Sequence, residues 1–179
     1  MSIRLAVLAT LAAFLLACGS PWKVLTTSGM PSALAGTTAF AVSVTYDGLM
    51  IGQKSEREYV SGKDADTAAS FAGDKVGMEE AVRRQLGGNK AGYTFDGGEI
   101  EAVVNIKFIE PGFYVGVAKM PATVISTVTF QKGGQVLDVI EVTTTRDADI
   151  IFASSGQRMR SCAEQIGDRM VGFLKKANK

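Results

Sequence analysis

The side chains that could do chemistry in this 179-residue chain are few, because the sequence contains no histidine. That absence removes Ser-His-Asp and Cys-His nucleophilic pairs, histidine-bound zinc and the most common general base. A catalytic site would have to be built from paired carboxylates, lysine, tyrosine or a serine–lysine pair. The sequence offers no nucleophile with a base at a suitable spacing, so we predict that the protein is not an enzyme.

Three short motifs still need an interpretation. Asp147 and Asp149 have the spacing of two ligands for a hard cation such as calcium, but no further acid or asparagine follows nearby. The Gly-rich segment 87–98 lacks the G-x-x-x-x-G-K-S/T spacing of a phosphate-binding loop. The segment 154–156 lacks the G-x-S-x-G pattern of a nucleophile elbow. We interpret them as a solvated loop, a turn and a helix start capped by Ser155, and we predict no metal site.

The charge balance bears on the class of partner. Lys and Arg total 19 and Asp and Glu total 18, which gives a formal net charge of +1. Nucleic-acid binding requires a basic surface, and a nearly neutral chain gives it no support. We therefore predict no nucleic-acid partner.

One cysteine lies in a context with a specific chemical meaning. Arg4 is followed by an uncharged apolar run, Leu5–Leu16, which is shorter than the about 20 residues of a membrane-spanning helix. The run ends in Leu15-Leu16-Ala17-Cys18, with a leucine three residues before the cysteine and a small residue directly before it. This pattern resembles the bacterial lipobox. The resemblance implies that residues 1–17 are a lipoprotein signal peptide and that Cys18 is the lipidated first residue of the mature protein.

A lipid on Cys18 sets the expected location. Two or more acyl chains hold a protein firmly to a membrane. Gly19 follows the cysteine, whereas enterobacterial lipoproteins kept in the inner membrane have Asp at that position. The resemblance therefore implies a lipid-anchored protein of the cell envelope, at the outer membrane and facing the periplasm. The alternatives are a short buried helix with an incidental cysteine and a signal peptide cleaved elsewhere.

The rest of the chain has the length of one domain with its own core. Residues 18–36 are rich in Gly, Ser and Pro and indicate a lipidated N-terminus followed by a linker or a loosely packed arm. Trp22 could rest at the lipid headgroups or pack onto the domain. Residues 37–179 then form a single periplasmic α/β domain.

Apolar periodicity predicts the elements of that domain. Alternating apolar residues indicate strands, and a Gly-Gly turn indicates a hairpin. Apolar residues at helical spacing indicate two helices. The first helix begins at Asp64 or Asp66, and the second begins at the segment 154–156. The second hairpin strand has a bulge near Val139, or has both of its faces covered. The predicted strands are about 38–46, 99–110, 122–131 and 135–145, and the predicted helices about 64–86 and 157–177.

The order β-α-β-β-β-α predicts the fold class α+β. We expect a two-layer sandwich, with a sheet of about four mainly antiparallel strands and two helices on one face.

Two apolar segments and one cysteine are candidates for binding or for the core. Phe113, Tyr114 and Val115 follow Pro-Gly, and two adjacent aromatic side chains cannot both point to one face of a strand. They bind a partner, or they plug the end of the core, and the same alternatives hold for 49–51. Cys162 lies on the apolar stripe of the last helix, which predicts a buried and inert thiol.

The whole layout is similar to small periplasmic lipoproteins of unknown function, which have a lipobox, a linker and one α/β domain. The run Ser155–Arg160, with the helix that follows it, resembles the last helix of such domains. In architecture it resembles the auxiliary lipoproteins that activate peptidoglycan synthases. The resemblance implies an accessory or scaffold protein that binds an envelope protein, with no cofactor except the covalent lipid on Cys18.

The alternative is a carrier for a small ligand or lipid, which would use a groove between sheet and helices. The feature that separates the two is an apolar cavity lined by Phe40, Val104, Phe108 and Phe130. A filled core at this place would favour protein contact.

Overall fold

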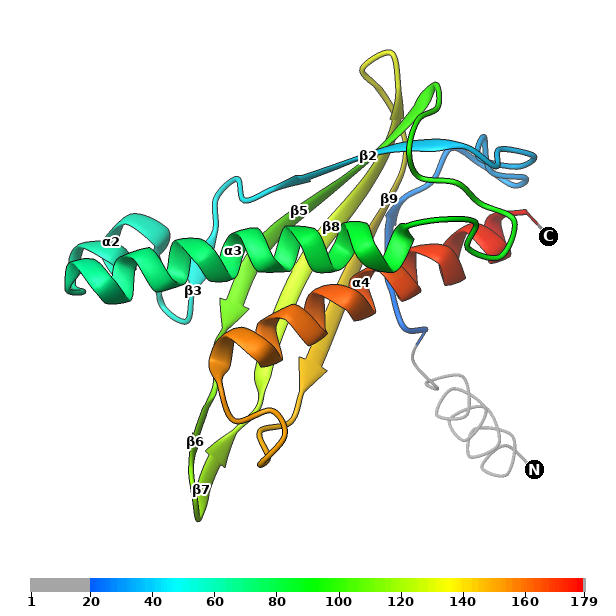
Figure 1. Cartoon of the computed structure of the whole chain (residues 1–179). Helices are drawn as coiled ribbons and strands as arrows, with labels where there is room; N and C mark the ends of the chain where they lie inside the picture. Colours follow the sequence, from blue (N-terminus) through cyan, green and yellow to red (C-terminus); the bar gives the residue numbers. More distant parts are fainter. Residues whose placement is uncertain (1–19, 179) are drawn as a thin grey trace, which may run out of the picture.

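The computed structural model describes residues 20–178, so the predicted signal peptide and Cys18 lie outside the described residues. A seven-stranded mixed sheet carries two long helices on one face (Figure 1). The predicted α+β class is therefore confirmed, and antiparallel pairs predominate. The predicted number of strands was too low, and the described residues form three helices where two were expected.

The elements follow the chain in a longer order than the predicted β-α-β-β-β-α. Helix α2 and several short strands account for the difference. The helices are α2 (Glu56–Ser61), α3 (Ala65–Leu86) and α4 (Ser155–Ala177). The strands are β1 (Lys23–Thr26), β2 (Phe40–Thr45), β3 (Met50–Ile51), β4 (Lys54–Ser55), β5 (Ile100–Glu110), β6 (Phe113–Val115), β7 (Ala118–Met120), β8 (Ala122–Lys132) and β9 (Gln135–Arg146).

The long strands β5, β8 and β9 form an antiparallel centre, and the sheet order is β1-β9-β8-β5-β3-β4. The other edge of β5 is shared by two short strands. Strand β2 pairs in parallel with its first half and β3 with its second half. These pairs are parallel because α3 carries the chain back across the sheet before β5 begins, as a crossover requires.

The core lies between this sheet and helices α3 and α4. Side chains of β5 and β8 alternate between buried and half-buried, as the predicted period of two requires. Phe40, Val104 and Phe130 are fully buried, and the rings of Phe40 and Phe130 lie 6.0 Å apart. Phe108 is half-buried and lies opposite Met50 and Ile125 in the sheet. The space between sheet and helices is thus packed with side chains at the place where a carrier groove was considered.

The helix starts follow local capping chemistry. The Asp64 carboxylate accepts a hydrogen bond from the Thr67 amide at 2.8 Å and caps α3, as predicted. Helix α4 is capped by Ser154, not by Ser155 as predicted, because the Ser154 hydroxyl accepts from the Gln157 amide. The described helices include none with the length and apolarity needed to cross a membrane.

The bulge predicted near Val139 is present two residues earlier. Phe130 pairs with Asp138 and Gln131 pairs with Val136, so Leu137 is the extra residue. It lets the inward positions of β9 change from odd to even numbers, whereas Val139 lies after the bulge, opposite Thr129, at a half-buried position.

Residues 22–34, which we call the arm, pack on the domain, and of the linker and the loosely packed arm considered from the sequence, the arm is observed. Strand β1 pairs with β9, with Lys23 opposite Glu141, and so covers an edge that would otherwise be open. The rings of Trp22 and Phe173 meet edge to face at 6.0 Å. Leu34 is fully buried. Of the two settings considered for Trp22, packing onto the domain is the one observed.

Candidate interaction surface

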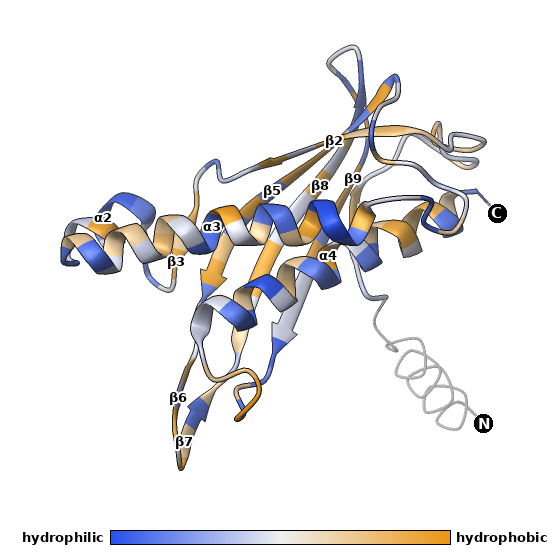
Figure 2. Cartoon of the chain, viewed as in Figure 1, coloured by the Kyte–Doolittle hydropathy of each residue, from blue (hydrophilic) through white to orange (hydrophobic). Residues whose placement is uncertain are grey.

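Two segments at one end of the sheet expose apolar side chains, and we call them together the hairpin end. They are residues 111–118, which include β6 and its turn, and residues 150–153 in the loop before α4. Strands β6 and β7 project beyond the sheet from the ends of β5 and β8 (Figure 1). Figure 2 shows hydrophobic colour at the tip of this hairpin and along the loop that precedes α4.

The side chains of the hairpin end are exposed to an unusual degree for their type. Phe113 is 46% exposed, Val115 is 66% exposed, and Val117 is fully exposed. Ile150 and Ile151 are 84% and 76% exposed on the second segment. Single exposed apolar residues are ordinary, but a cluster of five from two segments marks an interaction surface.

Two glycines shape the hairpin. Gly112 has a φ of +62°, and a Cβ there would lie 2.3 Å from the Met120 carbonyl oxygen. Gly116 has a φ of +67° in the turn between Val115 and Ala118. Both positions therefore require glycine, the first for a close backbone approach and the second for a left-handed turn.

A buried arginine joins the two segments. Arg158 Nη1 donates to the carbonyl oxygens of Phe152 (2.8 Å) and Ala153 (2.7 Å), and Nη2 donates to that of Pro111 (3.1 Å). Its side chain is only 1% exposed, and it has no ion-pair partner within residues 20–178. Burial lowers the pKa of the Arg158 guanidinium below its ordinary value, and an arginine side chain stays charged at neutral pH. One buried cation thus fixes both apolar segments to the same helix.

Arg158 lies on the buried face of α4, a position that the sequence analysis did not single out. Its spacing of four residues from Cys162, and of eight from Ile166, puts it on the same face as both. That spacing is the signal that could have located it. A single arginine at such a position is usually solvated, so only the carbonyl oxygens contributed by distant loops explain its burial.

The loop before α4 is shaped by its own side chains. The Asp149 carboxylate accepts from the amides of Ile151 (2.9 Å) and Phe152 (2.8 Å), which makes a tight turn that presents Ile150. The guanidinium of Arg146 lies 3.6 Å over the ring of Phe152. Asp147 is exposed beside this turn. The acidic pair therefore serves the loop, and no cluster of metal-ligating side chains is found within residues 20–178.

The predicted site residues take different positions. Phe113 and Val115 lie on the hairpin end, and Tyr114 between them is half-buried. Because β6 projects beyond the sheet, Phe113 and Val115 do not plug the end of the core. Cys18 lies outside the described residues. The sequence analysis missed Val117, Ile150 and Ile151, since apolar residues in irregular loops follow no period that would single them out.

The other two candidates belong to the core. Leu49 and Ile51 are buried, and Met50 between them is partly exposed. Cys162 is fully buried, and burial raises the pKa of its thiol to about 11. The thiol group lies 3.8 Å from the Ala122 carbonyl oxygen. At neutral pH it is protonated and unreactive, as the sequence analysis predicted.

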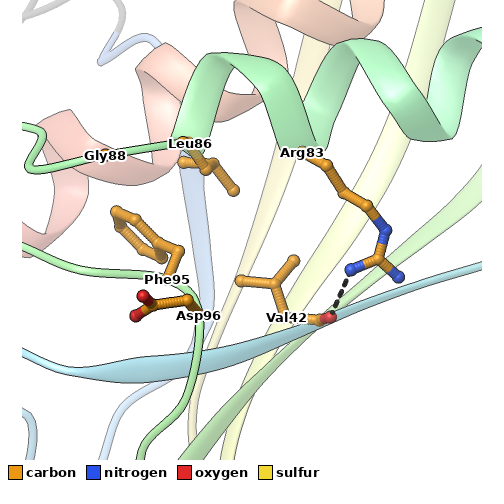
Figure 3. A pocket seen from close by; sticks show the side chains of 7 residues that line it. Val42, Arg83, Leu86, Gly88, Phe95 and Asp96 are labelled. Carbon is orange, nitrogen blue, oxygen red and sulfur yellow. Dashed lines mark hydrogen bonds between the residues drawn. The ribbon is translucent and has the colours of Figure 1, made fainter.

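A small cavity lies where the Gly-rich segment leaves α3 (Figure 3). It has a volume of about 270 Å³, and Gly87, Gly88 and Phe95 line it. Arg83 at its rim donates to the Val42 carbonyl oxygen at 3.1 Å and pairs with Glu79. A phosphate would meet the negative end of α3 and the Asp96 carboxylate here, so the turn interpretation fits this segment better.

A larger hollow surrounds Tyr46 beside α2. The Tyr46 hydroxyl donates to the Lys75 carbonyl oxygen at 2.7 Å, and Lys75 Nζ pairs with Glu56 at 2.6 Å. Burial, together with Glu79 and Glu56, raises the pKa of Tyr46 well above its usual range. This phenol is therefore a hydrogen-bond donor that holds α3 against β2, and it is unsuited to act as a base.

Comparisons with known proteins leave the family open. The chain matches no protein-family model and no curated protein. Among solved structures, a DUF330 protein from Xanthomonas campestris is similar with a TM-score of 0.45 and 13% identity, over 78% of this chain and 84% of that chain. A variant PelC dodecamer from Paraburkholderia phytofirmans has a TM-score of 0.36 and 14% identity, over 83% of this chain and 96% of that chain. Similarity at this level decides neither family nor function.

Proposed function

We propose that this chain is a lipid-anchored bacterial envelope protein that acts by binding and not by catalysis. Cys18 carries the lipid, at the periplasmic face of the outer membrane. The hairpin end is the contact surface through which the domain meets another component of the envelope. The observation that carries this proposal is the exposed apolar cluster that buried Arg158 holds in place.

The support for a binding role is energetic. Exposed apolar side chains are unfavourable in water by about 25 cal/mol for each Å² that contact would bury. Burying a guanidinium also carries a cost, which its hydrogen bonds to three carbonyl oxygens offset in part, since its Nε has no hydrogen-bond partner within residues 20–178. The exposed apolar cluster and the buried guanidinium both cost free energy in the isolated domain. This cost is recovered only when a partner covers the apolar cluster.

The carrier alternative has less support. Phe40, Val104 and Phe130 fill the space in which a groove would have to open. A second hollow of about 380 Å³, next to Trp22 and Phe173, is lined by Lys176 and Asp138 as well as by apolar groups. It lies between residues 22–32, Asp138 of β9 and the C-terminal end of α4, and none of the four residues expected to line a carrier groove lines it.

Photo-crosslinking in intact cells tests this proposal. A benzophenone amino acid replaces Val115 in the full chain, with and without Cys18→Ala, and membrane and soluble fractions are separated. We expect the acylated chain in the outer-membrane fraction, and an adduct from position 115 that Cys18→Ala loses. The same amino acid at Val136, which is also half exposed but lies beside the turn at the far end of β9, is the matched control.

The opposite result is equally clear. If the chain is soluble with either residue at position 18 and position 115 yields no more adduct than position 136, the anchor and the contact surface are both wrong. Binding of a small ligand by the soluble chain would then become the leading hypothesis.

A further inference from the structure

We infer that the hairpin end inserts into the lipid bilayer that holds the anchor, and thereby fixes the orientation of the domain on the membrane. The inference deepens the proposed function, on which it rests, by naming the partner of the hairpin end. Lipid is preferred to protein for three reasons: the composition of the two segments, their shape, and the place at which the chain enters the sheet.

The two segments carry no charge. Residues 111–118 read Pro-Gly-Phe-Tyr-Val-Gly-Val-Ala, and residues 150–153 read Ile-Ile-Phe-Ala. Protein interfaces usually surround an apolar centre with charged and polar groups from the same surface. An uncharged tip can enter the boundary between headgroups and acyl chains without taking an ion out of water, and tyrosine is enriched at that depth.

Lysines lie on the hairpin and around its base. Lys119 lies in β7 opposite Tyr114, between the turn and the base of the hairpin, and is exposed. Lys54 and Lys63 border a hollow together with Pro111. Their ammonium groups can reach the anionic headgroups while the tip enters the apolar layer, although Glu110, Asp147 and Asp149 reduce the net charge of this region.

The shape of the hairpin end suits a deformable partner surface. Val117 lies in the turn of the hairpin and Ile150 lies in the loop before α4, and both side chains are exposed. None of the cavities described above is lined by the five exposed residues of the hairpin end. A protein partner would need a matching concave site for two separate protrusions, whereas a fluid bilayer needs none.

The chain enters the sheet near the middle of β9, where Lys23 lies opposite Glu141. Strand β1 is antiparallel to β9, so it runs away from Arg146, which pairs with Ala122 at the base of the hairpin (Figure 1). Four peptide units separate Trp22 from Cys18, and they span at most about 15 Å whatever path they take. A lipid on Cys18 would therefore keep the bilayer within about 15 Å of Trp22, from which the second half of β9 leads to the hairpin end.

Depth-dependent fluorescence quenching tests the inference on the full chain. Val117→Cys and Ile151→Cys each add one thiol at the hairpin end, and Val136→Cys adds one at the far end of β9. Each thiol receives an environment-sensitive dye, and the protein is placed in vesicles of phosphatidylethanolamine and phosphatidylglycerol that contain nitroxide-labelled acyl chains. We expect the dyes at 117 and 151 to lose about half or more of their emission, because insertion to about 5–10 Å brings them within reach of the nitroxide. The dye at 136 should be unaffected.

A control separates this inference from the anchor itself. Because Cys162 is buried and its pKa is about 11, wild-type protein takes up dye only if the Cys18 thiol is not acylated. Dye uptake by the wild type would overturn the anchor, and quenching at 117 and 151 on vesicles would then still support insertion by the hairpin end alone.

The inference is overturned if the acylated protein floats with the vesicles while the dyes at 117 and 151 are quenched no more than the dye at 136. The anchor would stand in that case. A discrete protein adduct from position 115 in cells would then identify a protein as the partner of the hairpin end.

Discussion

Two buried charged residues, Asp138 and Arg158, each hold a different segment of the chain. The two segments differ in whether they bury or expose their apolar side chains. Asp138 and Arg158 are each 1% exposed, and neither forms an ion pair within residues 20–178. Asp138 Oδ1 accepts from the Ser28 amide (2.6 Å) and hydroxyl (3.0 Å), and Oδ2 accepts from the Ser32 hydroxyl. Arg158 donates instead to three carbonyl oxygens of two loops.

The arm that Asp138 holds buries what it carries. Leu34 is fully enclosed, and Trp22 packs on Phe173. The loops that Arg158 holds do the reverse and expose Val117 and Ile150 to solvent. In both places a buried side chain is held by hydrogen bonds to neutral groups, and these bonds close the fold at Asp138 and present a surface at Arg158, whose Nε is left without a partner within residues 20–178. This difference is why we assign binding to the hairpin end and a structural role to the arm.

The largest effect on stability should come from Arg158→Met. The change leaves the carbonyl oxygens of Pro111, Phe152 and Ala153 without their charged donor, and we expect the free energy of unfolding to fall by about 3 kcal/mol. Urea unfolding measures the loss, and hydrogen exchange should rise in both segments of the hairpin end. Arg160→Met is the matched control on the same helix, since Arg160 is partly exposed and its pair with Asp74 should contribute less than about 1 kcal/mol. Equal losses for the two variants would contradict the role of Arg158.

The corresponding change at the arm is Asp138→Ala. It removes the acceptor of three hydrogen bonds, and we expect a loss of about 2 kcal/mol. Faster hydrogen exchange should be confined to the arm around residues 28–34, with the hairpin end unchanged. If the hairpin end loosened as well, the two clamps would not be independent.

The pH dependence of the free energy of unfolding tests whether Cys162, one turn after Arg158 on α4, is buried. The Cys162 thiol ionises at about 11 in the folded protein and near 9.0 when exposed, because burial disfavours the thiolate. The unfolded state therefore releases its proton first, and this contribution to stability is complete below about pH 9 and is lost as the pH rises towards 11. We expect about 1 kcal/mol less stability from this group at pH 10 than at neutral pH. Cys162→Ala should remove that part of the pH dependence, and an identical pH profile would show that the thiol is not buried.

The smallest effect on stability should come from Val117→Glu. Its side chain is fully exposed, so unfolding should change by less than about 0.5 kcal/mol. Membrane contact should nevertheless decrease, because a carboxylate at the tip resists transfer to the acyl region. Nitroxide quenching of a dye at Ile151→Cys, with and without Val117→Glu, measures that loss. Unchanged quenching would show that the tip does not lead the insertion.

Much of the domain could be predicted from local patterns. Helix α3 with its Asp64 cap, helix α4, the strands β5, β8 and β9 and the turn between the last two were predicted within a few residues. These elements are long, and their periods of two or 3.6 residues repeat often enough to stand out. The short strands β3, β4 and β1 and the helix α2 hold too few residues to show a period, and the sequence analysis missed them.

The partners of each element, in contrast, were decided by the tertiary structure. Phe113 and Val115 could be singled out in the sequence, but Ile150 joins them only through Arg158. The arm looked like a linker because its Ser, Gly and Pro residues are typical of one, and Asp138, more than a hundred residues later, turns it into part of the fold. Periodicity reports which face of an element is apolar, since neighbours along the chain determine it. Which strand closes an edge, or which carbonyl oxygens satisfy a buried charge, depends on groups brought together only when the chain folds.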